Sequence, residues 1–446
     1  MTFFNRYGHA APLDGPGNRL FTTIRFMRDP YTCYRDWKQK YGDTFLIKAL
    51  NGNVVSTCNT ENIRRIFACN TQAVGQFAVD TIKPLMGDSS VILSSGEEHR
   101  KQRAVLSPCF YGERIDGKAS EIHEIALRTG SEWCKGESVR MMDPTLEISL
   151  EVIIRIVFGV QSPDRIKTYK AAVKEFVSSF HPALGFSQLL QRPLFGLSPW
   201  NRFVQARKVL YELLDEDIQN SGCPHAKTSV VEKLAEHRDA EGNRWSQSMI
   251  RSQLVTLLLA GHETTQIAMA WAMSWLHRSP DYLERLRIEL TECSTIEEMI
   301  ASPFLEGVCN EALRLNSVVS DLVRAVRQPL ELEELTLEAG SNVGVAICLV
   351  HEDPEIYPEP MQFNPERWLK RKPKPFEFMP FGGGIRRCPG ATLALLEMKV
   401  VIATWIRNFV FELPPDAPES EATYRRNITM APVSGIPLVY RGRTRS

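Results

Sequence analysis

The chain has 446 residues, of which 43% are hydrophobic and 24% are charged, so it can bury a sizeable core. Lysine plus arginine and aspartate plus glutamate both number 53, which makes the formal net charge zero. A nucleic-acid-binding domain usually carries a basic excess, and this balance therefore disfavours that class of function.

The N-terminal part of the chain predicts a short helix followed by a β-hairpin. The first twenty residues contain no apolar signal segment, and the ten cysteines are scattered singly without a CxxC pair, so we expect reduced thiols in a cytoplasmic protein with no membrane anchor. Residues 31–41 favour a helix. Residues 43–59 contain two β-rich runs around Asn51 and Gly52, a dipeptide typical of tight hairpin turns.

From about residue 61 to residue 310 the pattern is mostly helical. Within it, residues 254–276 are long and apolar enough to raise the question of a membrane span. His262, Glu263 and Thr264 fall in the middle of this segment, where polar groups are costly in lipid. No other segment would pair with it in a bilayer, so we interpret it as a long helix buried inside the protein.

The last third of the chain predicts a second β patch and one more helix. Alternating residues indicate β-structure at about 328–348, and residues 390–409 carry apolar side chains at helical spacing. The basic end, about 440–446, is expected to fray. No repeat or linker divides the chain, so residues 1–446 predict a single, mainly helical domain with small β patches.

One cysteine, Cys388, stands in an unusual stretch, FMPFGGGIRRCPGA at residues 378–391. A following helix N-terminus and adjacent arginines would stabilise a thiolate, and the glycines would let the backbone approach a flat or bulky group. From local chemistry alone the thiol could be a metal ligand, a nucleophile, half of a disulfide or a small buried side chain. A P-loop is disfavoured because no GK[ST] follows the glycines.

The order of residues in this stretch is more specific than its composition. Phe381, Gly384, Arg386, Cys388 and Gly390 form the pattern FxxGxRxCxG, which resembles the haem-binding loop of the cytochrome P450 family. The resemblance implies that Cys388 is the axial ligand of haem b (iron protoporphyrin IX) and that Phe381 packs beside its sulfur. It also implies the family's fold, a triangular, mainly helical prism with small β regions around one haem.

A second family mark lies in the long apolar helix. AGHETT, residues 260–265, resembles the family's A-G-x-[DE]-T stretch. An acid followed by an alcohol, here Glu263 and Thr264, can bend a helix and relay protons to bound O2. In the same resemblance Ala260 and Gly261 lie against the haem, where Gly261 leaves room for haem and oxygen.

A third mark is EALR followed by FNPERW at residues 363–368. Glu311 and Arg314, three residues apart, could be a routine surface pair. With Arg367 they resemble the family's buried charged network, and we expect them to be structural rather than catalytic.

The haem propionates call for cations, because arginine binds carboxylates through paired hydrogen bonds. His99 and Arg103 stand four apart in EEHRKQR, residues 97–103, and alone they would indicate a solvated helix face. The resemblance implies that they hold propionates, together with Arg324 and Arg386.

The resemblance covers about residues 30–437 and implies a haem-thiolate monooxygenase that uses O2 and two electrons. We expect it to hydroxylate or epoxidise a hydrophobic small molecule, such as a terpenoid, steroid-like or fatty-acyl compound, as soluble bacterial members do. The resemblance suggests that the pocket is lined by residues 76–86, roughly 176–190, 257–265, 318–323 and 429–431. The expected pocket side chains are Phe77, Val79, Ile82, Leu257, Ala260, Val318, Val319, Leu322 and Met430.

No flavin or iron–sulfur module fits in the chain, so we expect a monomer that takes electrons from a separate ferredoxin and ferredoxin reductase. Lys101, Arg103, Arg387 and Lys399 are expected to dock such an acidic partner. Three rival functions stay open. A peroxide-driven fatty-acid hydroxylase would replace the acid–alcohol pair, a haem sensor or carrier would not need that pair, and a cysteine hydrolase would need a base beside Cys388.

Overall fold

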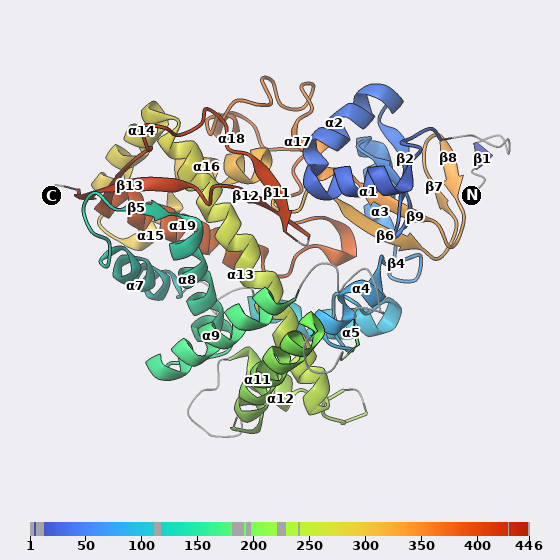
Figure 1. The fold of residues 1–446 in the computed structure, drawn as a ribbon, viewed down its shortest axis with the longest axis horizontal. Helices are drawn as coiled ribbons and strands as arrows, with labels where there is room; N and C mark the ends of the chain where they lie inside the picture. The colour runs from blue at the N-terminus through green and yellow to red at the C-terminus, as the bar shows by residue number, and fades with distance from the viewer. Residues whose placement is uncertain are drawn as a thin grey trace. The chain divides into compact units, whose positions relative to one another are not determined.

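The computed structural model describes residues 4–5, 13–110, 117–180, 191–192, 198–220, 229–239, 241–426 and 428–444. Helices predominate, with small sheets between them (Figure 1). The chain forms two compact units. The sheet unit comprises Met1–Phe77, Ala119–Leu146 and Thr264–Ser446, and the helical unit comprises Ala78–Lys118 and Glu147–Glu263.

The main sheet of the sheet unit has five strands in the order β2-β3-β9-β6-β4. Its strands are β2 (Thr44–Ala49), β3 (Gly52–Thr57), β9 (Asn342–Val345), β6 (Leu322–Val326) and β4 (Val74–Gln76). The predicted hairpin is confirmed, because β2 and β3 pair antiparallel with Ala49 opposite Gly52. The ring of Phe45, in β2, packs against the rings of Tyr34 and Trp37, which also contact each other.

The helices of the sheet unit follow from clear start signals in the sequence. Asn59 caps α3 (Thr60–Ala68) by accepting hydrogen bonds from the backbone N–H groups of Glu61 and Asn62. Prolines occupy the first turns of α2 (Pro30–Tyr41), α14 (Pro280–Glu292) and α16 (Pro303–Leu315). The helices are α1 (Arg19–Arg28), α2 (Pro30–Tyr41), α3 (Thr60–Ala68), α7 (Ala119–Gly130), α14 (Pro280–Glu292), α15 (Ile296–Ala301), α16 (Pro303–Leu315), α17 (Ile347–His351), α18 (Arg367–Lys370) and α19 (Ala391–Asn408). Helix α8 (Met142–Val152) begins in this unit and ends in the helical unit.

The C-terminal part differs from the sequence expectation. Residues 440–443, expected to fray, are the last part of β13 (Pro437–Arg443), which pairs with β10 (Phe409–Glu412) on one side and β5 (Ser138–Arg140) on the other. Residues 437–439 pair with β5, and residues 439–443 pair with β10, so the ladder with β10 continues through the charged segment and explains why it is ordered. Strands β7 (Leu330–Glu331) and β8 (Leu335–Leu337) lie in the β patch predicted at about 328–348, and β1 (Phe4–Asn5) completes their three-stranded sheet. The two-stranded sheet of β11 (Thr423–Arg426) and β12 (Thr429–Pro432) was not predicted.

The helical unit contains α4 (Val79–Met86), α5 (Gly96–Leu106), α9 (Pro163–Ser179), α11 (Pro199–Asn220), α12 (Val230–Glu236) and the first half of α13 (Gln247–His277). The stacked rings of Phe176 and Phe203, with centroids 5.4 Å apart, join α9 to α11. Helix α13 contains the apolar segment 254–276, as expected. Within the described residues, no helix is both long enough and apolar enough to cross a bilayer.

Candidate active site

The cysteine loop, residues 381–390, belongs to the sheet unit and is closed by its own backbone. The N–H of Cys388 donates to the carbonyl oxygen of Phe381 at 2.9 Å, and a short 3-10 turn, Gly384–Arg386, lies between them. Helix α19 begins at Ala391, so the half-buried Cys388 stands just before a helix N-terminus. That position favours the thiolate over the thiol.

The glycines of this loop serve a close contact with helix α3. Gly384 has a φ of +64°, and a Cβ there would lie 2.4 Å from the carbonyl oxygen of Phe67. A Cβ at Gly383 would lie 2.6 Å from the ring of Phe67. The sequence led us to expect room for a flat group, but the neighbour that requires glycine at these two positions is Phe67. At Gly390 a Cβ would meet only the sulfur of Cys388, at 4.0 Å.

A buried histidine connects the loop to helices α16 and α17. The Nε2 of His351 accepts the backbone N–H of Met379 at 2.9 Å, and its Nδ1 lies 2.8 Å from the hydroxyl oxygen of Ser317. Burial lowers the pKa of His351 to about 3, so the ring is neutral and Nδ1 carries the proton that Ser317 accepts. Because Met379 lies two residues before Phe381, this side chain fixes the start of the cysteine loop. The sequence reading missed this residue.

Glu311 is the centre of a buried charged network. Its carboxylate accepts hydrogen bonds from Arg314, Arg367 and the indole N–H of Trp368, all at 2.9 Å. It also accepts the backbone N–H of Asn364 at 3.0 Å. The side chains of Glu311 and Arg314 are both 0% exposed, so they do not form the surface pair that their spacing alone would suggest.

The same network extends towards the cysteine loop. Arg314 donates to the carbonyl oxygen of His351 at 2.6 Å. The ring of Phe378 packs on Trp368 and on His351, with centroids 4.4 and 5.4 Å away. Trp368, His351 and Phe378 therefore join the charged network to the chain that enters the loop.

Arg324 is a second buried cation of the sheet unit, after Arg314. It lies in β6 with 8% of its surface exposed, and burial lowers its pKa to about 10. Among the residues that the structure describes, it has no carboxylate partner, and its guanidinium donates only to the carbonyl oxygen of Val323 at 3.1 Å. Leu322, two residues earlier and hence on the same face of β6, lies against Gly382 of the cysteine loop. A buried cation is costly without a counter-charge, so this face of β6 suits an anionic group of a ligand.

Of the expected pocket residues in the sheet unit, four lie near one another or near the loop. The backbone N–H of Met430 donates to the carbonyl oxygen of Val318 at 2.8 Å, and both side chains are buried. Leu322 contacts the loop as described above, and Val319 is half-buried beside Val318. Phe77 lies elsewhere in the unit, close to Gly52 at the start of β3.

Helix α13, which belongs to the helical unit up to Glu263 and to the sheet unit from Thr264, has an accessible stretch between two buried ones. Residues 252–259 are buried, whereas Ala260 is exposed and Gly261, Glu263 and Thr264 are half-buried. A Cβ at Gly261 would lie 2.7 Å from the Cδ1 of Ile153, so in this structure the room that Gly261 leaves is used by Ile153. Ala260, Glu263 and Thr264 provide an accessible surface in the middle of an otherwise buried helix.

The remaining candidates of the helical unit lie on α5, α4 and α13. His99 is 3% exposed and Arg103 is half-buried one turn later on α5. The chain before α5 is tied to α13, because Gln253 accepts the N–H of Val91 at 3.0 Å and Thr256 donates to Ser90 at 2.7 Å.

Val79 and Ile82 are half-buried on α4, and Leu257 is buried on α13. Part of the expected pocket stretch, residues 181–190, lies outside the described residues.

Comparison with known proteins gives one consistent result. A model of the cytochrome P450 family matches residues 16–437. The chain is 30% identical to cytochrome P450 135B1 of Mycobacterium tuberculosis (strain H37Rv) over 431 residues, which covers 94% of this chain and 90% of the relative. It is 29% identical to cytochrome P450 138 of Mycobacterium bovis over 432 residues, covering 96% and 95%. Retinoic acid-bound cyanobacterial CYP120A1 superposes with a TM-score of 0.83 at 24% identity, covering 97% of this chain and 100% of that one.

Proposed function

Because this chain belongs to the cytochrome P450 family and is therefore a haem-thiolate monooxygenase, we propose that Cys388 supplies the thiolate and that the substrate is a hydrophobic small molecule. The fold is the mainly helical one of the family. When bound, the haem supplies the oxidative chemistry, and thiolate ligation favours cleavage of the O–O bond.

The observation that carries the proposal is the buried cation beside the cysteine loop. Arg324 has no acidic partner among the described residues, and its strand reaches the loop through Leu322. A haem propionate would supply the counter-charge that Arg324 lacks, so the residues present fit the cofactor. We assign Arg386, His99 and Arg103 to the same task.

The other residues have roles that the chemistry of the site supports. Phe381, Gly384 and Gly390 shape the loop around Cys388, and Ala260 and Gly261 present a small surface on α13. Glu263 and Thr264, both half-buried on α13, pass protons to the distal side of the site. Glu311, Arg314 and Arg367 hold the polypeptide behind the loop rather than take part in the reaction.

The substrate class follows from the mainly apolar residues that we assign to the pocket: Phe77, Val79, Ile82, Leu257, Ala260, Val318, Val319, Leu322 and Met430. They favour a terpenoid, steroid-like or fatty-acyl molecule, which is hydroxylated or epoxidised. The fold shared with the retinoic acid-bound structure is able to enclose an extended apolar molecule of this kind.

Electrons come from separate proteins, for which we propose a ferredoxin and its reductase. Arg387 is exposed on the cysteine loop, whereas Lys399 is half-buried and lies 3.4 Å from Glu306. With Lys101 and Arg103 they form the proposed basic docking set. We also propose a cytoplasmic monomer with a single catalytic domain, which is supported by one family model spanning parts of both units.

The proposal is tested by replacing Arg324 with glutamine and measuring the haem bound per protein. The change removes a charge-assisted hydrogen bond, so we expect haem affinity to fall by about tenfold or more. The protein without haem should be at least as stable as wild type, because an uncompensated buried charge has been removed.

The matched control is Arg327→Gln, which alters an exposed arginine just beyond the same strand and should leave haem binding unchanged. Equal haem affinity in wild type and Arg324→Gln would show that Arg324 does not serve the cofactor.

A further inference from the structure

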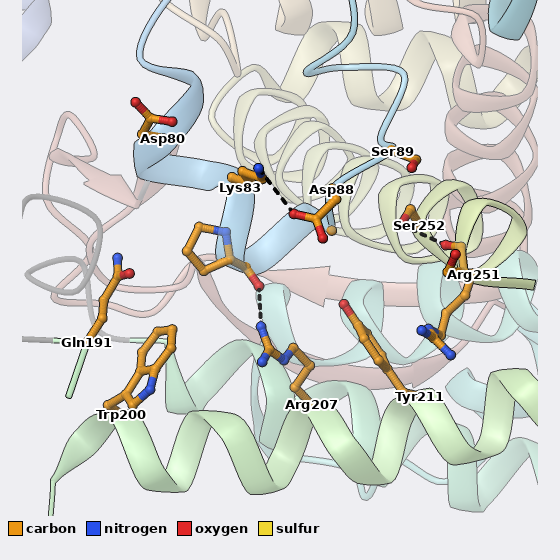
Figure 2. Close-up of a pocket in the computed structure, with 13 residues that line it drawn as sticks. Asp80, Lys83, Asp88, Ser89, Gln191, Trp200, Arg207, Tyr211, Arg251 and Ser252 are labelled. Atoms are coloured by element: carbon orange, nitrogen blue, oxygen red, sulfur yellow. Dashed lines mark hydrogen bonds and ion pairs between the residues drawn. The ribbon is translucent and has the colours of Figure 1, made fainter. Parts of the chain in front are cut away.

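A separate pocket of about 510 Å³ lies wholly within the helical unit (Figure 2). It is bordered by α4, α11 and the first turns of α13, and none of the groups proposed above to bind haem or transfer protons lines it. Its volume is within the range of small-molecule sites, but its lining is polar and charged rather than apolar. The lining includes Lys83, Arg207, Arg251, Asp80 and Asp88.

Two of the three cations are already paired with carboxylates. Lys83 lies 3.3 Å from Asp88, and Arg251 lies 2.5 Å from Asp215. Arg207 differs from them. Its guanidinium donates to the carbonyl oxygen of Pro84 at 3.2 Å, and within the described ranges no carboxylate pairs with it. Figure 2 shows Asp80 at the opposite edge of the pocket from Arg207, with no interaction between them.

Helix α11 presents further groups to the same pocket. Trp200, Arg207 and Tyr211 are seven and four residues apart, so they share one face of the helix, and Figure 2 shows them along the pocket side of α11. The hydroxyl of Tyr211 has no hydrogen bond to any residue that the structure describes, and burial raises its pKa, so it is a neutral donor at pH 7. The ring of Trp200 offers an apolar wall beside these two donors.

We propose that this pocket binds the carboxylate of an amphipathic carboxylic acid through Arg207 and Tyr211, and that the substrate is such an acid. The second half of this statement rests on the proposed function, whereas the binding itself does not. A ligand carboxylate would give Arg207 the partner that it lacks among the described residues, at the edge of the pocket opposite Asp80. A phosphate would bring close to two charges towards a pocket that also contains Asp80 and Asp88, so the carboxylate is the better match.

The test is calorimetric titration of the haem-containing enzyme with dodecanoic acid, its methyl ester and dodecyl phosphate. The acid should bind at least tenfold more tightly than the ester, which has the same chain but no charge. Arg207→Gln should weaken binding of the acid about tenfold or more, and Tyr211→Phe should weaken it by a smaller factor.

The control is Arg202→Gln on the same helix, because Arg202 pairs with Glu175 and does not line the pocket. It should bind the acid as wild type does, and circular dichroism should show that all variants are folded. Equal binding of acid and ester, tighter binding of the phosphate, or wild-type affinity in Arg207→Gln would each overturn the proposal.

The spectrum of the reduced, CO-treated enzyme separates this inference from the proposed function. If the enzyme gives a thiolate spectrum and Arg207→Gln binds the acid as wild type does, the proposed function stands and only the proposed carboxylate site is refuted. Acid binding that depends on Arg207 in a protein without a thiolate spectrum would support the pocket and defeat the proposed function.

Discussion

His351 provides a direct way to perturb the cysteine loop without touching it. Glutamine can place an acceptor near the position of Nε2, and asparagine can place a polar group near that of Nδ1. His351→Gln therefore keeps the bond to the N–H of Met379 and loses the bond to Ser317, while His351→Asn does the reverse.

The two variants should lower the free energy of unfolding by different amounts. His351→Asn leaves the buried N–H of Met379 without an acceptor, which costs about 1–3 kcal/mol in the free energy of unfolding. In His351→Gln the partner left behind is a serine hydroxyl that still lies 3.5 Å from the carbonyl oxygens of Leu313 and Arg314, so we expect only about 0.5–1.5 kcal/mol. These amounts are a sizeable part of the roughly 5–15 kcal/mol that stabilises a typical domain.

Two measurements are made on the haem-containing enzyme. Urea unfolding at pH 7 gives the free energy of unfolding, and the absorption spectrum after reduction and CO addition gives the fraction of enzyme that keeps the thiolate spectrum. His351→Asn should lose more of this spectrum than His351→Gln. The control is His277→Gln, because His277 is also buried and bonds the carbonyl oxygen of Met273 but has no contact with the loop. If His277→Gln lowers the thiolate fraction as much as His351→Asn does, the bond to Met379 does not position the loop.

Other perturbations follow from the same structure. Glu311→Gln leaves Arg314 buried without its counter-charge and should lower the free energy of unfolding by about 3–5 kcal/mol in urea titrations; a loss below about 1 kcal/mol would contradict the network. Gly384→Ala forces a Cβ to 2.4 Å from the carbonyl oxygen of Phe67 and should reduce the amount of haem retained after purification. In Gly390→Ala the new Cβ lies 4.0 Å from the sulfur of Cys388, so this variant should retain its haem. Equal haem retention in the two variants would refute the importance of the contact with Phe67. Burial lowers the pKa of His351 to about 3, below its unfolded value near 6.5, so between these values the unfolded state binds one more proton than the folded state. As the pH falls from about 6.5 towards the folded pKa, the free energy of unfolding should therefore decrease by up to ~1.4 kcal/mol per pH unit. His351→Gln should flatten this slope in acid titrations, and an unchanged slope would contradict the argument. Thr264→Ala should raise the O2 consumed per product formed, and unchanged coupling would remove Thr264 from the proton path.

Local patterns were sufficient for the elements whose signals lie close together in the chain. The β2–β3 hairpin, the long helix α13 and the helix after Cys388 are all visible as periodicity and turn residues. Strand β13 was missed because its partners lie far away in sequence, with Phe409 opposite Arg443 and Val139 opposite Leu438. A basic segment such as YRGR gives no local indication that it pairs with a strand some thirty residues earlier, β10.

In the candidate active site, too, sequence patterns predicted local features but not contacts between distant segments. The spacing around Cys388 identified the loop, but the sequence could not show that Phe67 is what requires Gly384. Arginines also look alike in a sequence. Arg314 is paired inside the protein, Arg324 is buried without a carboxylate, and Arg207 faces a polar pocket, and only the fold distinguishes them. His351 was missed because its two partners come from separate segments, at Ser317 and Met379.

The most direct test of the central claim is the absorption spectrum of the reduced, CO-treated enzyme, recorded for wild type, Cys388→Ser and Cys134→Ser. Cys134 is an exposed cysteine outside the loop, so its variant controls for loss of a thiol. We predict a far-red-shifted Soret band in wild type and Cys134→Ser and its loss in Cys388→Ser, because the shift requires thiolate ligation. A folded, haem-loaded wild type without this band, or a Cys388→Ser enzyme that keeps it, would contradict the assignment of Cys388 as the iron ligand.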